Sequence, residues 1–138
     1  MDCIFCAIVE GKAPAEVVYQ DEMTMAFMDV NPANAGHTLV IPRKHVPDIF
    51  AIDEETAAAM MRTAVRVARA IEAALRPDGI NLIQANGRAA FQSVFHSHLH
   101  IIPRWWGDGI TLPWRPKPGD PAAIQTTAAR IRAHIEEP

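Results

Sequence analysis

The sequence has few cysteines, no long apolar run and no excess of positive charge, and each shortage excludes a class of protein. Its 138 residues include only two cysteines, too few for a disulfide framework. No apolar stretch approaches the ~20 residues of a membrane span, so no membrane partner is expected. Thirteen basic residues against 16 acidic ones give a net charge of −3, which lacks the basic footprint of a nucleic-acid-binding protein.

The N-terminus and the composition indicate an ordinary globular protein. Residues Met1–Phe5 contain Asp2 and no basic segment followed by an apolar stretch. The pattern of a secretory signal is therefore missing, which predicts a cytoplasmic protein. Hydrophobic residues make up 49% of the chain and charged residues 21%, a typical globular balance. The length predicts a single domain over residues 1–138.

Local patterns predict an α+β fold. The clearest element is a long helix over residues 53–75, with Asp53 as N-cap and apolar residues at positions 60, 64, 67, 71 and 75. Shorter helices are expected at 4–11 and 122–135. Strands are expected at 16–19, 23–29, 38–41, 80–85 and 94–103. This order predicts a mainly antiparallel, five-stranded sheet with one long helix and a C-terminal helix.

Three histidines alternate in the last predicted strand. The segment reads His96-Ser97-His98-Leu99-His100, and alternate residues of a strand share one face. The three imidazoles are therefore expected to point the same way. Such a row suits two kinds of chemistry, a metal site or phosphate chemistry in which a neutral imidazole attacks phosphorus and a cationic one stabilises charge.

The polar residues nearby favour phosphate chemistry. Gln92 and Ser93 lie just before the histidines and can supply hydrogen bonds to phosphate oxygens or to a leaving group. Asn86 ends the preceding strand and is followed by Gly87, which allows close backbone approach. His37 follows Gly36 and precedes another predicted strand. An imidazole in that position can orient the nucleophilic histidine and fix its tautomer.

The two cysteines raise a separate question. Cys3 and Cys6 have the C-x-x-C spacing of half a zinc site. His45 and His96 are candidates for the other two ligands. Two unmetallated thiols or a redox pair are the alternative interpretations of the same spacing.

Taken together, these segments resemble the histidine-triad (HIT) family. His96–Ile102 matches the family signature H-φ-H-φ-H-φ-φ, in which φ is apolar, with Ser97 as an imperfect first φ. The block from Gly36 to His45 also matches, and the similarity extends from Cys3–Cys6 to Pro103–Arg104. The chain is most similar to the small bacterial branch that resembles nucleoside-phosphoramidate hydrolases.

The resemblance implies a role for each matched residue. His98 would attack the α-phosphorus to form a nucleotidyl-histidine intermediate, His100 would contact phosphate and His37 would support the nucleophile, without a catalytic metal. Ser93, Gln92 and Asn86 match contacts to phosphate or leaving group, and Asp29 matches the carboxylate that binds the ribose hydroxyls. The pocket for the base of a purine nucleotide or nucleotide conjugate is matched by Phe5, Ile8, Phe27, Val30 and Leu39.

The resemblance also concerns metal and assembly. In some bacterial relatives the set matched by Cys3, Cys6, His45 and His96 binds a structural zinc. Relatives are usually homodimers with a sheet that continues across the interface. Three tryptophans follow the histidine segment, and they are expected in the dimer interface rather than over the active site or a second base: Trp105, Trp106 and Trp114.

The same residues are compatible with other functions. The stretch Pro103–Asp108 somewhat resembles the dinucleoside polyphosphate hydrolases. A non-catalytic nucleotide-binding adaptor would keep the same pocket, and a pure metal-binding module would use the histidines differently. Phe91 stands where many members have glycine. A bulky side chain there is expected to alter the phosphate loop or narrow the site of the leaving group.

Overall fold

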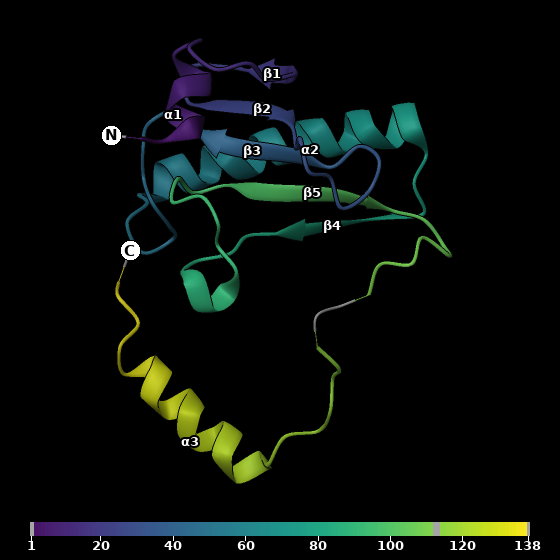
Figure 1. The fold of residues 1–138 in the computed structure, drawn as a ribbon. Coiled ribbons are helices and arrows are strands. Elements are labelled where there is room, and N and C mark those ends of the chain that lie inside the picture. Colours follow the sequence, from purple (N-terminus) through teal and green to yellow (C-terminus); the bar gives the residue numbers. More distant parts are fainter. Residues whose placement is uncertain (1, 112–113, 138) are drawn as a thin grey trace.

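The computed structural model describes residues 2–111 and 114–137, and these contain a five-stranded antiparallel sheet of order β1-β2-β3-β5-β4 (Figure 1). The strands are β1 (Val17–Gln20), β2 (Thr24–Met28), β3 (Thr38–Pro42), β4 (Gly79–Ile83) and β5 (Leu99–Arg104). The helices are α1 (Ile4–Val9), α2 (Glu54–Leu75) and α3 (Pro121–Arg132), with a 3₁₀ turn η1 (Arg88–Ala90). The predicted fold class is confirmed.

Helix α2 covers one face of the sheet. It starts where Asp53 accepts a hydrogen bond from the Thr56 backbone N–H at 3.0 Å, and it ends at Arg76, whose φ of 50° is left-handed. Met60, Val67 and Ile71 are buried against the sheet, and each such side chain contributes about 1.5–3 kcal/mol. Leu75, expected on the same stripe, is 43% exposed because it lies in the last turn.

The opposite face of the sheet carries α1 and a second cluster. Strand alternation sends Ala26, Val40 and Ile101 towards α2. The intervening side chains therefore face α1, where they pack around its one buried residue, Phe5. On this face Phe27, Leu39, His100 and Ile83 are neighbours in one row, since they are paired across β2, β3, β5 and β4. The row places a histidine next to an apolar surface.

The expected strand over 94–103 is wrong in its first half. Strand β5 begins only at Leu99, and the segment holding His96 and His98 is irregular. The segment that lies opposite contains Pro42 and Pro47, and a proline has no backbone N–H to donate to the hydrogen bonds of a sheet. A single backbone hydrogen bond, from the Ser97 N–H to the Val46 carbonyl at 2.7 Å, connects this irregular segment to the stretch that follows β3.

The remaining boundaries differ by small shifts. Helix α1 stops at Val9, before the left-handed Gly11, and α3 ends at Arg132 rather than 135. Strand β4 stops at Ile83, two residues earlier than expected. The predicted loop 86–92 contains the 3₁₀ turn η1. Terminal residues of helices and strands have few local signals, so such shifts are ordinary.

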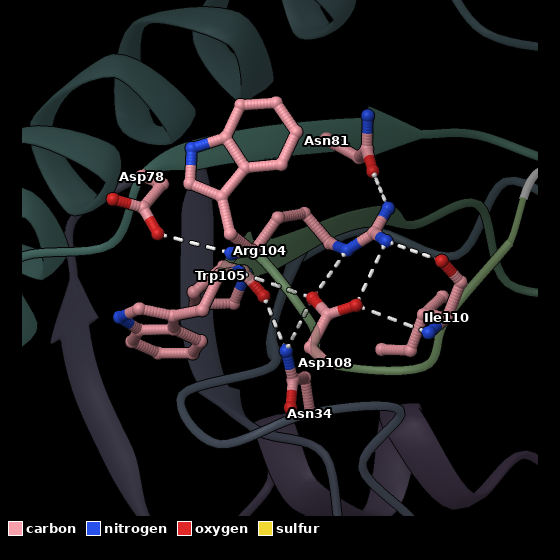
Figure 2. Close-up of polar contacts among 9 residues, drawn as sticks. Asn34, Asp78, Asn81, Arg104, Trp105, Asp108 and Ile110 are labelled. Carbon is pink, nitrogen blue, oxygen red and sulfur yellow. Dashed lines mark hydrogen bonds and ion pairs between the residues drawn. The ribbon is translucent and has the colours of Figure 1, made fainter.

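A hydrogen-bonded ion pair closes the far end of β5. Asp108 accepts hydrogen bonds from Arg104 Nε at 2.8 Å and from the backbone N–H groups of Trp105 and Ile110 (Figure 2). Asn34 donates to the Asp108 carboxylate and to the Pro103 carbonyl, at 3.2 and 2.9 Å. The loop that leads to His37 is thereby fastened to the end of β5.

Helix α3 stands apart from the sheet (Figure 1). None of its residues is buried, and a 12-residue helix without packing is marginal in water. Across residues 2–111 and 114–137, no helix has the length and apolar character needed to cross a membrane.

Candidate active site

A cavity of about 380 Å³ lies on the α1 face of the sheet. Nine of the eleven residues predicted to bind the nucleotide line it: Phe5, Ile8, Phe27, Asp29, Val30, Leu39, Ser93, His98 and His100. Sequence reasoning missed six more lining residues: Ile4, Pro14, Ala15, Met28, Asn31 and Val94. The cavity thus combines an apolar wall with a carboxylate and two imidazoles, which suits a flat ring joined to a polar, anionic group.

His98 presents an unprotonated nitrogen for attack. Its Nδ1 lies 2.8 Å from the His96 carbonyl oxygen. A carbonyl only accepts, so the proton sits on Nδ1 and the Nε2 lone pair is free. The His98 side chain is 96% buried, and its ring meets the Phe5 ring edge-on, with the two ring centroids 5.2 Å apart. Burial lowers the pKa of His98 below its ordinary value, outweighing the His96 carbonyl and the Asp29 charge, which raise it. The imidazole is therefore neutral at neutral pH.

His37 fixes the tautomer of His100. The Ala33 backbone N–H donates to His37 Nδ1 at 2.9 Å, which puts the His37 proton on Nε2. That nitrogen lies 2.9 Å from His100 Nδ1. His37 therefore donates to His100, and His100 carries its own proton on Nε2. Burial and the charges of His98 and His37 lower the pKa of His100 to about 4.

The position of His37 differs from the expected one. Its hydrogen bond is to His100, whereas the sequence suggested direct support of the nucleophile. Asp29 Oδ2 lies 3.5 Å from His37 Nε2. The three ligand atoms of Asp29, His37 and His100 lie within 4.8 Å of one another. A metal ion there would have to replace the hydrogen bond between the two imidazoles.

Gln92 and Asn86 do not reach the cavity. Gln92 is buried, accepts from the Gly87 N–H at 2.8 Å and donates to the Pro47 and Val94 carbonyls at 2.6 and 3.0 Å. Asn86 accepts from the Ile49 N–H at 2.7 Å and bonds with Gln84. Contact with phosphate would require these bonds to be given up. Both amides instead connect the loop that precedes Ser93 in the sequence to the loop that follows Pro47.

Phe91 also lies outside the cavity. Its side chain is 87% exposed, and it is not among the residues that line this cavity. Its φ of 68° is left-handed, a conformation that costs a bulky residue about 1–2 kcal/mol. This conformation explains why glycine suits the position. The expected narrowing of the site by Phe91 is not observed.

The two cysteines meet two histidines beside the cavity. Cys6 Sγ lies 3.4 Å from His45 Nδ1 and 3.5 Å from His96 Nδ1, and Cys3 Sγ lies 3.5 Å from His96 Nδ1. A tetrahedral zinc with ordinary bond lengths requires S···N edges of about 3.6 Å. His96 Nε2 donates to the Pro42 carbonyl at 2.7 Å, which leaves Nδ1 free for a metal. The four residues fit a zinc ion.

The histidine row is thus divided between two sites. His98 and His100 line the cavity, whereas His96 is fully buried and turned towards the cysteines. All three rings still lie on the α1 side of the sheet, since His96 and His98 both touch Phe5. The two chemistries considered for the row are not exclusive, because a different part of the row is available for each.

Comparison with known proteins shows where this arrangement occurs. The HIT domain model matches residues 10–105. Adenosine 5'-monophosphoramidase hnt1 of Schizosaccharomyces pombe is 34% identical, over 99% of this chain and 100% of its own. The crystal structure of a HIT family member from Bacillus subtilis is 36% identical, with a TM-score of 0.93 and all of both chains covered. A Zn-bound histidine triad family protein from Mycobacterium smegmatis is 40% identical, with a TM-score of 0.77 and coverage of 96% of this chain and 97% of that one. The chain therefore belongs to the histidine-triad (HIT) family.

Proposed function

We propose that this protein is a nucleotide hydrolase or nucleotidyl transferase that acts at the α-phosphate of nucleoside phosphoramidate-type substrates through a nucleotidyl-histidine intermediate. The observation that carries the proposal is the free Nε2 of a neutral His98 in a cavity with one apolar end. The phosphoramidase name of the fission yeast relative supports hydrolysis of a nucleotide.

Different parts of the cavity would bind the base, the ribose and the α-phosphate of the substrate. The purine base would lie against Phe27, Leu39 and Phe5, which are buried and line the cavity. The Asp29 carboxylate at the rim would accept hydrogen bonds from the ribose hydroxyls. This places the α-phosphate at His98 and His100, where the His100 Nε2–H can donate to a phosphate oxygen.

The reaction has two steps: the bond between His98 and phosphorus forms in the first and breaks in the second. In the first, His98 Nε2 forms a bond to phosphorus and the P–N bond to the leaving amine breaks. The electron pair stays with the amine nitrogen, which takes up a proton and departs. In the second, a water oxygen attacks phosphorus, the bond to His98 breaks and the water loses a proton. Covalent catalysis in this way replaces one difficult step by two easier ones.

The hydrogen bonds around the site hold each nitrogen in the required state. The His96 carbonyl keeps the His98 proton away from the attacking atom. The bond from His37 keeps a proton on the cavity side of His100, so the phosphate meets a donor that is already aimed at it. Such preorganised donors stabilise charge that develops on phosphate oxygens.

We propose that Cys3, Cys6, His45 and His96 hold a structural zinc. The S···N distances and the free Nδ1 of His96 support this, as does the Zn-bound relative. Bound zinc would crosslink the N-terminal segment to the chain around β5. The four side chains would then stabilise the fold without touching the substrate, while the His96 backbone carbonyl still orients His98.

We also propose that two copies of the chain form a homodimer through β4. This strand is an edge of the sheet, and exposed edges favour pairing. Leu82 on β4 and Met61 and Val65 on α2 are apolar and exposed, which supports a contact on the α2 side of that edge. Of the three tryptophans, Trp106 and Trp114 are also exposed.

A His98→Ala variant tests the catalytic proposal. We expect turnover of adenosine 5'-phosphoramidate to be lost while AMP still binds, measured by product chromatography and calorimetry. The matched control is His134→Ala, which removes an exposed histidine of the C-terminal segment. Rapid alkaline quench of the wild type, which preserves a phosphorus–imidazole bond, should trap a nucleotidyl group on His98. Turnover retained by His98→Ala would overturn the role of nucleophile.

The same assay separates the alternative functions. The Pro103–Asp108 stretch that suggested dinucleoside polyphosphates lies at the far end of β5, and Arg104 is engaged by Asp108 there. We therefore expect a diadenosine polyphosphate to be cleaved more slowly than the phosphoramidate. A protein that binds AMP tightly and cleaves neither compound would be a non-catalytic adaptor.

A further inference from the structure

One side chain of the loop before His37 is bonded to a part of the molecule that the proposed mechanism does not use. Asn34 Nδ2 lies 2.9 Å from the Pro103 carbonyl oxygen and 3.2 Å from Asp108 Oδ2. A carbonyl and a carboxylate accept hydrogen bonds and do not donate them. Both hydrogens of the Asn34 amide are therefore engaged at the end of β5, which fixes the orientation of this side chain (Figure 2).

The carboxylate that Asn34 contacts is itself held by several donors. The Asp108 side chain is only 8% exposed, and it accepts from the Arg104 guanidinium at 2.8 and 3.1 Å. It also accepts from the backbone N–H groups of Trp105 and Ile110, each at 3.0 Å. The hydrogen bonds from Arg104 and from these N–H groups hold the pKa of Asp108 far below its usual range. Asn34 is thus bonded to a fixed anion.

The backbone around Asn34 contacts His37 at two points. The Ala33 N–H donates to His37 Nδ1 at 2.9 Å, and the Asn34 carbonyl accepts from the His37 backbone N–H at 3.2 Å. Within the part of the chain that the structure describes, Asn34 is the one residue between 30 and 36 whose side chain hydrogen-bonds outside this loop. The bonds of its amide to β5 therefore set where the Ala33 N–H lies.

His37 and His100 can share their protons in two ways. In the structure, His37 Nε2–H donates to His100 Nδ1 at 2.9 Å, and His100 carries its proton on Nε2. In the other arrangement, His37 is protonated on Nδ1 and His100 has a bare Nε2. That arrangement sets the Ala33 N–H against a second donor, so the contact with Ala33 excludes it. Asp29 Oδ2, 3.5 Å from His37 Nε2, favours the observed arrangement as well, so loss of the Ala33 contact alone shifts the balance in part.

We infer that Asn34 is a positioning residue, which acts through the Ala33 N–H to keep the His100 Nε2–H directed at the substrate phosphate. The inference rests on the proposed function, because the bound phosphate makes the location of this proton important. A phosphate oxygen accepts a hydrogen bond from an N–H and is repelled by a bare nitrogen at the same place. Asn34 does not line the nucleotide cavity, so it acts without touching the substrate.

Asn34→Asp and Asn34→Ala test this role. Aspartate keeps the size of asparagine, removes both donated hydrogen bonds and adds a negative charge beside Asp108. Alanine removes the amide without adding a charge, and it tests the same contact if the aspartate variant does not fold. The matched control is Asn81→Asp, the same exchange in the same network. There the side-chain oxygen accepts from Arg104 at 2.7 Å, and aspartate retains that acceptor.

The first measurement is ¹⁵N NMR of the histidine side chains of the full-length, substrate-free protein at neutral pH. Protonated and bare nitrogens of a neutral imidazole resonate in separate ranges, and the spectrum of His100→Gln assigns the signals of His100. We expect a proton on His100 Nε2 in the wild type and in Asn81→Asp. In both Asn34 variants we expect a fraction of the molecules to have a bare Nε2.

The second measurement is kcat/KM for adenosine 5'-phosphoramidate. Removal of one preorganised donor lowers kcat by about 10²–10³-fold. The Asn34 variants lose the donor in only a fraction of the molecules and hold the rest less firmly, so we expect a decrease of up to about tenfold in kcat/KM. Asn81→Asp should retain the wild-type value.

The two measurements separate the inference from the proposed function. If both Asn34 variants keep the proton on His100 Nε2, the inference is wrong, whatever their stability or activity. A proton that moves equally in Asn81→Asp overturns it too, because the amide of Asn34 would then have no special part. Spectra that change without a loss of kcat/KM would refute the link to catalysis. A wild type that cleaves no phosphoramidate refutes the proposed function, while the spectra still decide whether Asn34 controls the His100 proton.

Discussion

Acid should destabilise this protein through His100, and the effect can be estimated from the structure. Burial and two neighbouring imidazoles lower the pKa of this side chain from 6.5 to about 4. Between those values the unfolded chain binds a proton that the folded chain does not, so stability falls as the pH falls below 6.5. The full effect is about 3 kcal/mol at 1.36 kcal/mol for each pKa unit, and about 2 kcal/mol of it is lost between pH 7 and pH 5.

Urea denaturation followed by tryptophan fluorescence measures this effect. The comparison is between the wild type and His100→Gln at pH 7 and pH 5. Glutamine does not titrate, and its side-chain oxygen can accept the hydrogen bond from His37. We therefore expect the free energy of unfolding of the wild type to fall by about 2 kcal/mol more than that of the variant. Equal losses in the two proteins would refute the reasoning, because the proton would then be taken up elsewhere.

Three further predictions concern other parts of the molecule. Asp108→Ala leaves Arg104 without its ion pair and two backbone N–H groups without their acceptor, so it should lower the midpoint of thermal and urea melts; an unchanged midpoint would contradict the role given to this network. Cys3→Ser should abolish zinc binding in metal analysis, and unchanged zinc content would exclude the four-residue site. Leu82→Lys should shift the protein from dimer to monomer in sedimentation velocity, since it places a charge beside the β4 edge, and an unchanged dimer would move the interface elsewhere.

The elements with regular local patterns could be predicted from the sequence. The helix over 53–75 has a capping aspartate and a clear apolar period, and α2 follows it closely. The start of β5 could not be predicted in the same way. Its alternating pattern extends through His96, but a ladder needs N–H groups from a partner, and the partner here contains Pro42 and Pro47. The residues that decide where β5 begins therefore lie far from it in the sequence.

The site was predictable as a set of residues and less so as a set of contacts. His98 and His100 of the family signature, and Asp29 and the apolar residues matched by the wider resemblance, line one cavity. The hydrogen bond from His37 to His100 depends on the tautomer set by the Ala33 N–H, which no sequence pattern encodes. Gln92 looks like a phosphate ligand because it is polar and adjacent to Ser93, yet all its hydrogen bonds go to backbone groups.

The place of α1 has a practical consequence for anyone who shortens this protein. The span recognised by the family model begins at residue 10, but Phe5 and Ile8 form part of the cavity and Cys3 and Cys6 half of the metal cluster. An expression clone cut at the recognised boundary would retain every histidine of the signature. It would nevertheless lack one wall of the proposed base pocket and two of the four proposed zinc ligands, so a loss of activity in it would say nothing about the histidines.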